Sequence, residues 1–205
     1  MNKISITFFT LALLTIPVYG RAIEPQPVQS RCSLTEANSP TVRGIRLGMS
    51  LEQLLGLFPG SSRRKEMKDA IERAKAASGG EIVYLVFDPT TDASGDRFAG
   101  IDSISAGISK GRVADFNVLY VGPTWRTIDE WVAKLSETFS LPRAQEWVAG
   151  SGESPNRMLK CGAIEIEAAI QGGGGSVRVR NTESLKEAQD RATAEEERRR
   201  RAFKP

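Results

Sequence analysis

Hydrophobic and polar positions follow a helical spacing in two segments of the chain. Apolar residues recur three and four positions apart after Ser50, which is the spacing of a buried helical stripe. Ser50 and Gln53 have the spacing of a capping box, in which each side chain bonds to the backbone N–H of the other residue. Thr127 and Glu130 repeat this signature before a second amphipathic segment, which ends at Leu141–Pro142. The pattern predicts two capped helices.

A third helix is predicted over 63–77, with Ser62 as its N-cap, because four apolar side chains of that segment share one helical face. The cap and the apolar spacing after Ser50 also match those after Thr127. This match suggests an internal repeat of 44–121 and 122–181, and a chance similarity between two amphipathic helices is the alternative.

Alternation of apolar and polar residues predicts β-strands between and after these helices. The predicted strands are 82–87, 101–108, 112–121, 143–148, 157–161, 163–171 and 176–181. Ser109–Gly111 has the composition of a hairpin turn, and 172–175 is predicted to be a flexible glycine turn. A symmetric turn there places Glu167 opposite Arg180 on the solvent side. The fold class is therefore α+β, with capped helices packed on one curved antiparallel sheet or on two small tandem sheets.

The chain divides into four segments of different composition. Residues 1–20 carry one lysine before an uncharged apolar stretch and are predicted to be a signal peptide, with an uncleaved anchor as the alternative. Residues 21–43 are predicted to be an extended linker, and 44–181 the α+β domain. Residues 182–205 are predicted to be a charged tail, helical or disordered. Export to the periplasm or the medium follows from the first segment.

Cys32 and Cys161 are the two cysteines of the chain. An even number of cysteines in an exported chain favours one disulfide, here between the linker and a late strand. Two free thiols or an intermolecular bridge are the alternatives. A zinc site is disfavoured because the chain has no histidine and no C-x-x-C spacing. No cofactor or metal is expected.

Composition and charge remove several function classes. The absence of histidine excludes Ser-His and Cys-His nucleophile pairs. The net charge is only +3, so the basic surface typical of a nucleic-acid-binding protein is not expected. Gly107–Gly111 matches G-x-S-x-G, but this motif requires a strand-to-helix turn and a histidine. Enzymatic activity is therefore not expected; carboxylate chemistry by Glu165 and Glu167 is a weaker alternative.

Three aromatic residues and one basic cluster are the candidate contact sites. Trp131 lies on the apolar stripe of a helix and is predicted to be core. Trp125 and Trp147 lie at the ends of predicted elements, where they either pack over the sheet or contact a partner. The tail carries Arg198, Arg199, Arg200 and Arg201, which are either a solvated helical face or a contact with anionic lipid.

The segment Gly44–Leu55 reads GIRLGMSLEQLL, which predicts a short strand, then L-G-M-S, then an acidic capped helix. This opening resembles that of the small exported SmpA/OmlA-type domains, and the architecture is similar to that of the β-lactamase inhibitor proteins. The resemblance implies helices on an antiparallel sheet and a role in binding or assembly. The chain also resembles signal-bearing bacterial proteins of unknown function with the same opening.

These observations predict a non-catalytic, exported protein-binding module of the cell envelope. Its expected partner is another envelope or secreted protein. Two alternatives remain: a factor that associates with anionic membrane surfaces through its basic tail, and a secreted inhibitor of an enzyme. The sequence does not fix the oligomeric state.

Overall fold

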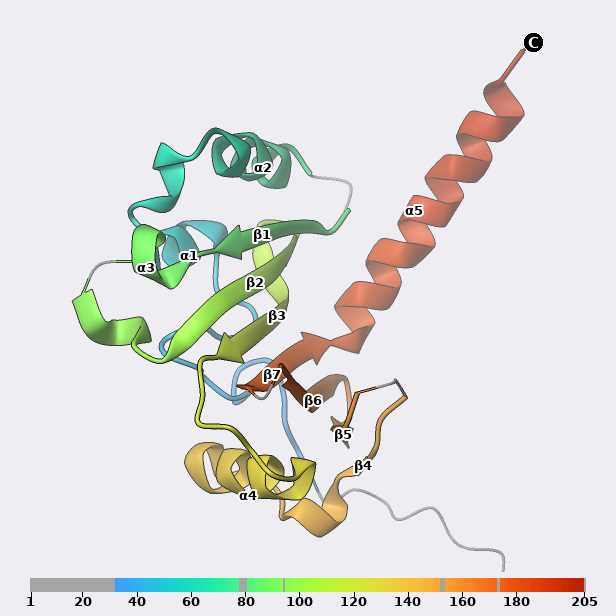
Figure 1. Ribbon diagram of the computed structural model, residues 1–205. Helices are drawn as coiled ribbons and strands as arrows, with labels where there is room; N and C mark the ends of the chain where they lie inside the picture. The colour runs from blue at the N-terminus through green and yellow to red at the C-terminus, as the bar shows by residue number, and fades with distance from the viewer. Residues whose placement is uncertain (1–31, 78–80, 94, 152–153, 173, 205) are drawn as a thin grey trace, which may run out of the picture.

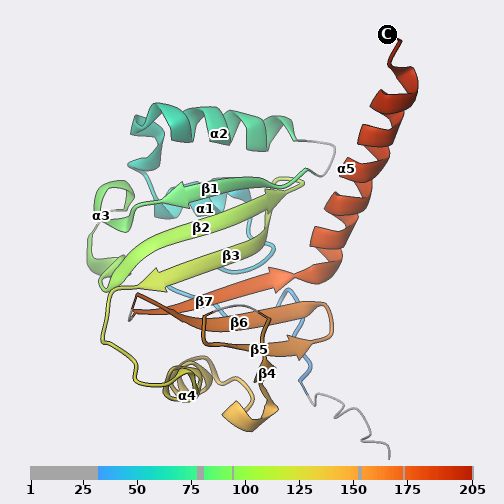
Figure 2. The ribbon, with the colours of Figure 1, turned by 45° about the vertical axis from the view of Figure 1, so that its right-hand side comes forward.

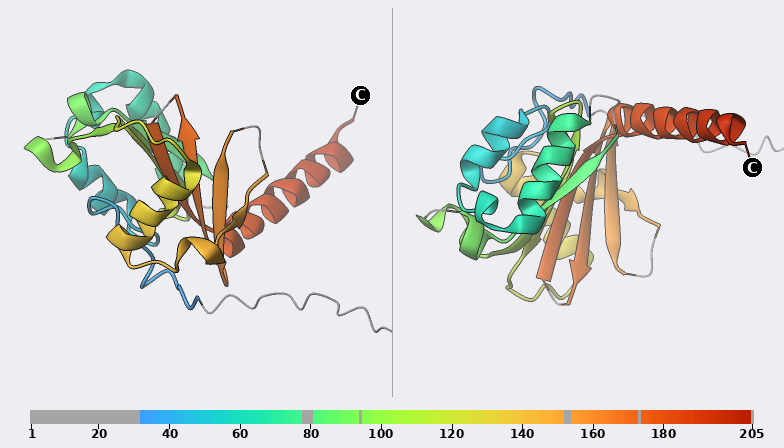
Figure 3. Two further views of the ribbon diagram at one scale, coloured as in Figure 1. Left: turned by 60° about the horizontal axis from the view of Figure 1, so that its bottom comes forward. Right: turned by 90° about the horizontal axis from the view of Figure 1, so that it is seen from above.

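The computed structural model describes residues 32–77, 81–93, 95–151, 154–172 and 174–204, so the predicted signal peptide lies outside the described residues (Figure 1). Within the described residues, one curved antiparallel sheet of seven strands carries helices on one of its faces (Figure 3). The α+β prediction is confirmed, and a single sheet replaces the alternative of two tandem sheets.

The helices are α1 (Leu51–Leu57), α2 (Lys65–Ala76), α3 (Pro89–Asp92), α4 (Ile128–Phe139) and α5 (Thr182–Ala202). The strands are β1 (Val83–Phe87), β2 (Ile101–Ser109), β3 (Arg112–Tyr120), β4 (Val148–Ala149), β5 (Asn156–Cys161), β6 (Ile164–Gln171) and β7 (Gly174–Asn181). Their order across the sheet is β1-β2-β3-β7-β6-β5-β4. Two meanders, β1 to β3 and β4 to β7, therefore meet where β3 pairs with β7 (Figure 2).

The cap of α1 is formed as predicted, whereas that of α4 is formed only in part and that of α2 differs from the prediction. Ser50 and Gln53 form both bonds of the capping box. At α4 the Thr127 hydroxyl accepts from the backbone N–H of Glu130, but the Glu130 side chain accepts from Arg126 instead of closing the box. The predicted Ser62 cap is wrong, because Ser61–Arg63 is a 3-10 turn and α2 begins at Lys65 without a side-chain cap.

The L-G-M-S segment is joined to the sheet through its backbone. Gly48 has φ +71° and donates its N–H to the carbonyl of Val113 at 2.8 Å. Val113 donates back to the carbonyl of Met49 at 3.0 Å. The short strand predicted before L-G-M-S, over 44–46, is wrong, since the structure pairs only Ile45 of this segment, in an isolated bridge with Val42.

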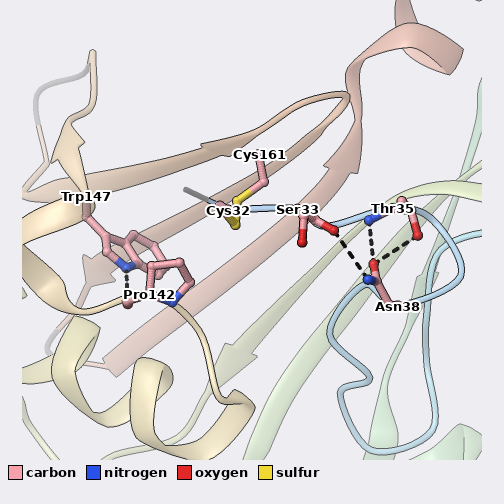
Figure 4. The surroundings of a disulfide bond; sticks show 7 residues. All are labelled: Cys32, Ser33, Thr35, Asn38, Pro142, Trp147 and Cys161. Atoms are coloured by element: carbon pink, nitrogen blue, oxygen red, sulfur yellow. Dashed lines mark hydrogen bonds between the residues drawn. A yellow bond between two sulfur atoms is a disulfide. The ribbon is translucent and has the colours of Figure 1, made fainter. Parts of the chain in front are cut away.

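The disulfide prediction is confirmed: Cys32 and Cys161 are bonded, with Cα atoms 5.1 Å apart (Figure 4). The bridge ties the described part of the predicted linker to the end of β5. Beyond the bridge, Glu36 accepts from the side-chain amide of Asn181 at 3.1 Å, and Val42 is fully buried. The linker from Cys32 onward is therefore packed against the body of the protein.

The core lies between the helices and one face of the sheet. Phe58, which follows α1, stacks on Phe87 of β1 and on Phe98, with ring centroids 4.2 and 4.8 Å apart. Trp131 of α4 is buried as predicted and donates its indole N–H to the carbonyl of Ser176 at 2.8 Å. A side chain at Gly175 would lie 2.6 Å from the Trp131 ring, so this contact requires glycine in β7.

The same contact corrects the prediction for the glycine run. Gly174 and Gly175 belong to β7, and Gly172 lies in the turn. The pairing therefore shifts: Glu167 lies opposite Arg178, and Arg180 lies opposite Glu165. The predicted pairing of Glu167 with Arg180 is wrong.

The strand predicted over 143–148 is also largely wrong. Ala144–Glu146 is a 3-10 turn, and β4 keeps only Val148 and Ala149. Trp147, between them, is buried and donates its indole N–H to the carbonyl of Pro142 at 3.1 Å (Figure 4). Burial of this side chain, and not strand propensity, fixes the local backbone.

The tail is helical and projects beyond the sheet (Figures 1 and 2). The Asn181 side chain caps α5 by accepting from Glu183 and Ser184. Lys110 in the β2–β3 turn forms an exposed ion pair with Glu187 at 2.7 Å, which links the second turn of the helix to the sheet.

Reduction of the disulfide should lower the free energy of unfolding by about 2–5 kcal/mol, because the bridge constrains the unfolded chain. Urea denaturation of the oxidised and reduced protein measures this difference. Cys32→Ala should reproduce the loss in the oxidised protein, and reduction should then change the variant little. An equal effect of the reductant on wild type and variant would contradict this role for the bridge.

Candidate functional site

The face of the sheet opposite α1, α2 and α4 is a candidate binding surface (Figure 3). Cross-strand pairing aligns one row of residues across all seven strands: Val148, Met158, Glu167, Arg178, Asn117, Ser105 and Val86. A neighbouring row consists of Lys160, Glu165, Arg180, Asp115, Gly107 and Tyr84. We call the surface formed by these two rows, with Gln171, Ser176 and Ala169 beside them, the open face.

Asp115 is the central charge of the open face, and its side chain is only 2% exposed. Arg178 binds it through two nitrogens, with Nε 2.9 Å from Oδ1. The hydroxyl of Tyr84 donates to Oδ2 at 3.2 Å. The hydrogen bond to Asp115 raises the pKa of Arg178, and burial followed by the Asp115 charge raises the pKa of Tyr84. These contacts hold three strands' side chains in one arrangement.

A second cluster of charges lies on β5, β6 and β7. Arg180 binds Glu165, with its Nε 2.6 Å from Oε1, and Lys160 lies 3.8 Å from the other carboxylate oxygen. Glu167 accepts from the Asn156 amide at 3.2 Å and lies 3.9 Å from Arg180. Positive and negative groups alternate along the open face, so it has no strong charge of either sign.

The position of the Tyr84 ring depends on a glycine in the neighbouring strand. Gly107 is the cross-strand partner of Tyr84, and a Cβ there would lie 3.0 Å from Cε1 of the ring. The missing side chain lets the ring lie across β2 and reach Asp115 on β3. Tyr84 is nevertheless 48% exposed, and Val86 beside it on the same strand face is 55% exposed.

A shallow hollow of about 350 Å³ lies on the open face. Its lining comes from five strands and consists of Tyr84, Ser105, Asn117, Glu167, Ala169, Gln171, Ser176 and Arg178. Small side chains at Ser105, Ala169 and Ser176 leave the space. The sequence pattern does not reveal this site, because the hollow depends on the register of five strands. The alternation that puts Tyr84 and Val86 on the outer side of 82–87 was the available signal.

Trp125 lines a different, apolar hollow of about 290 Å³ between α4 and the segment after β3. Its ring packs on Trp131, with centroids 5.1 Å apart, and Tyr120 meets Trp131 edge-on at 5.3 Å. The indole nitrogen of Trp125 is buried and has no hydrogen-bond partner among the described residues. Trp125 is half-buried, so both of its predicted roles, packing and partner contact, remain compatible with its place. Trp147, by contrast, is only 5% exposed and packs in the core.

The arginines of the tail are paired along α5. Arg199, Arg200 and Arg201 contact the glutamates four positions earlier, at 3.3, 3.0 and 3.4 Å. Arg198 lies 3.0 Å from Glu195. The cluster is therefore exposed but partly neutralised by the preceding turn, which is typical of a solvated helix.

The residues considered for catalysis lie in a turn and among the paired charges of the open face. Gly107–Gly111 ends β2 and forms the β2–β3 turn, in which Lys110 and Gly111 have positive φ. Glu165 and Glu167 are held by arginine and asparagine side chains of the open face. Among the described residues no cluster of three metal-ligating acidic or cysteine side chains occurs, and none of the described helices is long and apolar enough to cross a membrane.

Comparisons of the chain with models of protein families, with curated proteins and with solved structures found no match. The resemblance of Gly44–Leu55 to the opening of exported binding domains stays a prediction.

Replacing Asp115 by asparagine should destabilise the protein by about 1–3 kcal/mol, because the half-buried guanidinium of Arg178 loses its charged partner. Chemical denaturation checks this value. Glu167→Gln is the matched control, because Glu167 is more exposed than Asp115 and the amide of the variant can still accept from Asn156. The free energy of unfolding should therefore fall less in Glu167→Gln than in the Asp115 variant. Equal losses in the two variants would contradict a central role for Asp115.

Stability should also fall in alkali. Burial raises the pKa of both Tyr84 and Tyr120 in the folded protein, so folding favours the protonated phenols. This contribution is complete below the unfolded value of about 10 and is lost as the pH rises through the folded pKa. Thermal denaturation from about pH 8 to about pH 11 measures the decline. Tyr84→Phe should make the decline shallower, and an unchanged slope would contradict the assignment.

Proposed function

We propose that the protein is a non-catalytic, exported protein-binding module, and that its partner docks on the open face of the sheet. The observation that carries this proposal is that the helices cover one face of the sheet and leave the other exposed. One face of the seven-stranded sheet is covered by helices and the linker. The open face has no such cover among the described residues and keeps Tyr84 and Val86 about half exposed. Exposed tyrosine in a rigid setting is a frequent source of binding energy at protein interfaces.

The charge arrangement supports the same role. The ion pairs of Asp115 with Arg178 and of Glu165 with Arg180 fix side chains across the sheet before any partner arrives. A surface that is already ordered loses less conformational entropy on binding. The disulfide fits an oxidising environment and therefore supports the export part of the proposal.

The tail is the weaker candidate for the binding element. Its four arginines are paired with Glu195, Glu196 and Glu197, so the helix offers little excess positive charge to anionic lipid. An inhibitor of an enzyme would be a special case of the proposed module and needs no different surface.

Val86→Lys should weaken capture of a partner from an extract of the source cell envelope by at least about tenfold, because it places a charge in an apolar contact. Quantitative co-purification with wild-type and variant baits measures the effect. Thr138→Lys introduces the same charge on the exposed side of α4, beside the Trp125 hollow, and is the matched control. A bait that ends at Asn181 tests the tail.

Retention by the Thr138→Lys bait and by the truncated bait is expected. Loss with Thr138→Lys alone would move the site to the Trp125 hollow. Loss with the truncated bait alone, reversed by moderate salt, would make α5 the functional element and contradict the proposal.

A further inference from the structure

The hollow on the open face is bordered by charged side chains that have partners and contains neutral side chains that have none among the described residues. The charged groups that border it are already paired: Arg178 is bound by Asp115, and Glu167 accepts from Asn156. A charged ligand would have to compete with these contacts and be desolvated without gaining a free counter-charge. The hollow is therefore poorly suited to an acidic or basic ligand.

Three neutral polar side chains in the hollow are uncommitted. Within the described part of the chain, the side chains of Ser105, Asn117 and Gln171 form no hydrogen bond with the protein. Each amide presents both donors and an acceptor, as a peptide group does. They come from β3 and β6, on opposite sides of β7, and Ser105 adds a hydroxyl from β2.

Tyr84 supplies the apolar part of the hollow. Its ring lies across Gly107, and its hydroxyl is held by Asp115, so its orientation is fixed from both ends. Val86 continues the apolar contact on the same strand. A ligand here meets a rigid aromatic surface at one side and neutral hydrogen-bonding groups at the other.

We infer that the hollow receives an uncharged peptide loop of the partner protein, hydrogen-bonded by Asn117 and Gln171 and packed against Tyr84. This inference rests on the proposed function and names the chemistry of its partner. Recognition is by neutral hydrogen bonds and apolar contact, so affinity depends little on salt. A glycan is the competing occupant, since sugars also bind to aromatic rings and amides, but the apolar Val86 beside Tyr84 favours a peptide.

The test uses a phage-displayed library of random, disulfide-closed peptides, selected on the oxidised protein. Synthetic copies of the enriched peptides are then titrated against wild type and variants. Enriched loops should contain few Asp, Glu, Lys or Arg residues, and their affinity should change less than about twofold between about 0.05 and about 0.5 M NaCl. Asn117→Ala and Gln171→Ala should each weaken binding about threefold to tenfold.

Gln145→Ala is the matched control, because Gln145 is an exposed glutamine outside the open face and its loss should leave the affinity unchanged. Val86→Lys should weaken binding more than about tenfold. Each variant's thermal unfolding is compared with that of wild type, so that loss of binding is separated from loss of fold.

The outcomes separate this inference from the proposed function. If Val86→Lys abolishes binding while Asn117→Ala and Gln171→Ala do not, the open face is the interface and the hollow is not its recognition site. Charged peptides with steeply salt-dependent affinity would overturn the inference. Displacement of the peptide by oligosaccharides of N-acetylglucosamine, lost in Asn117→Ala, would replace the peptide with a glycan. A library without binders above background would overturn the inference, while the proposed function would still be decided by the co-purification experiment.

Discussion

The pairing of β3 with β7 is the constraint on which the rest of the structure depends. It joins the two meanders in one sheet and places Phe116 opposite Val179 and Val118 opposite Val177, all facing the helices. The same register puts Asp115 opposite Arg180 and Asn117 opposite Arg178 on the other face. Because side chains alternate between faces, a slip of one residue would bury these charges and expose the core. One strand pair thus decides both where the core forms and which residues the open face presents.

The charges of the open face are best understood as positioning groups. Asp115 lies on the uncovered side of the sheet and is still almost inaccessible, because Arg178 and Tyr84 cover it. Ion pairs of this kind often add little net stability compared with an apolar substitute, but breaking one is costly. Their effect here is to leave few alternative arrangements for the long side chains of β3, β6 and β7. The groups left over for contact are then neutral, which separates the electrostatics of folding from those of recognition.

Most features that the sequence predicted correctly are local, whereas most of its errors lie where distant contacts decide the backbone. Contacts between residues a few positions apart determine the capping box at Ser50, the β2–β3 turn and the glutamate–arginine pairs of α5. The disulfide was predicted from the even number of cysteines and the expected export of the chain. The division of the glycine run between turn and strand depends on Trp131, which lies more than forty residues away and requires Gly175 beneath its ring. The error displaced the expected partners of Arg178 and Arg180 by two residues along β6. The hollow, which needs five strands in register, was therefore beyond the sequence pattern.

Gly107 shows how stability and surface geometry conflict at one position. Glycine within a strand costs about 0.5–1 kcal/mol relative to alanine, through the entropy it loses on folding. An alanine there would bring its methyl group to 3.0 Å from the Tyr84 ring and 3.1 Å from Ile82, so the ring would have to shift. A shift of a few tenths of an ångström is enough to relieve this contact, and it would act on the ring whose hydroxyl donates to Asp115. Local conflicts with the intended secondary structure are expected where a surface has a task besides folding. The conflict here lies at the aromatic edge of the hollow, where the proposed contact needs a rigid ring.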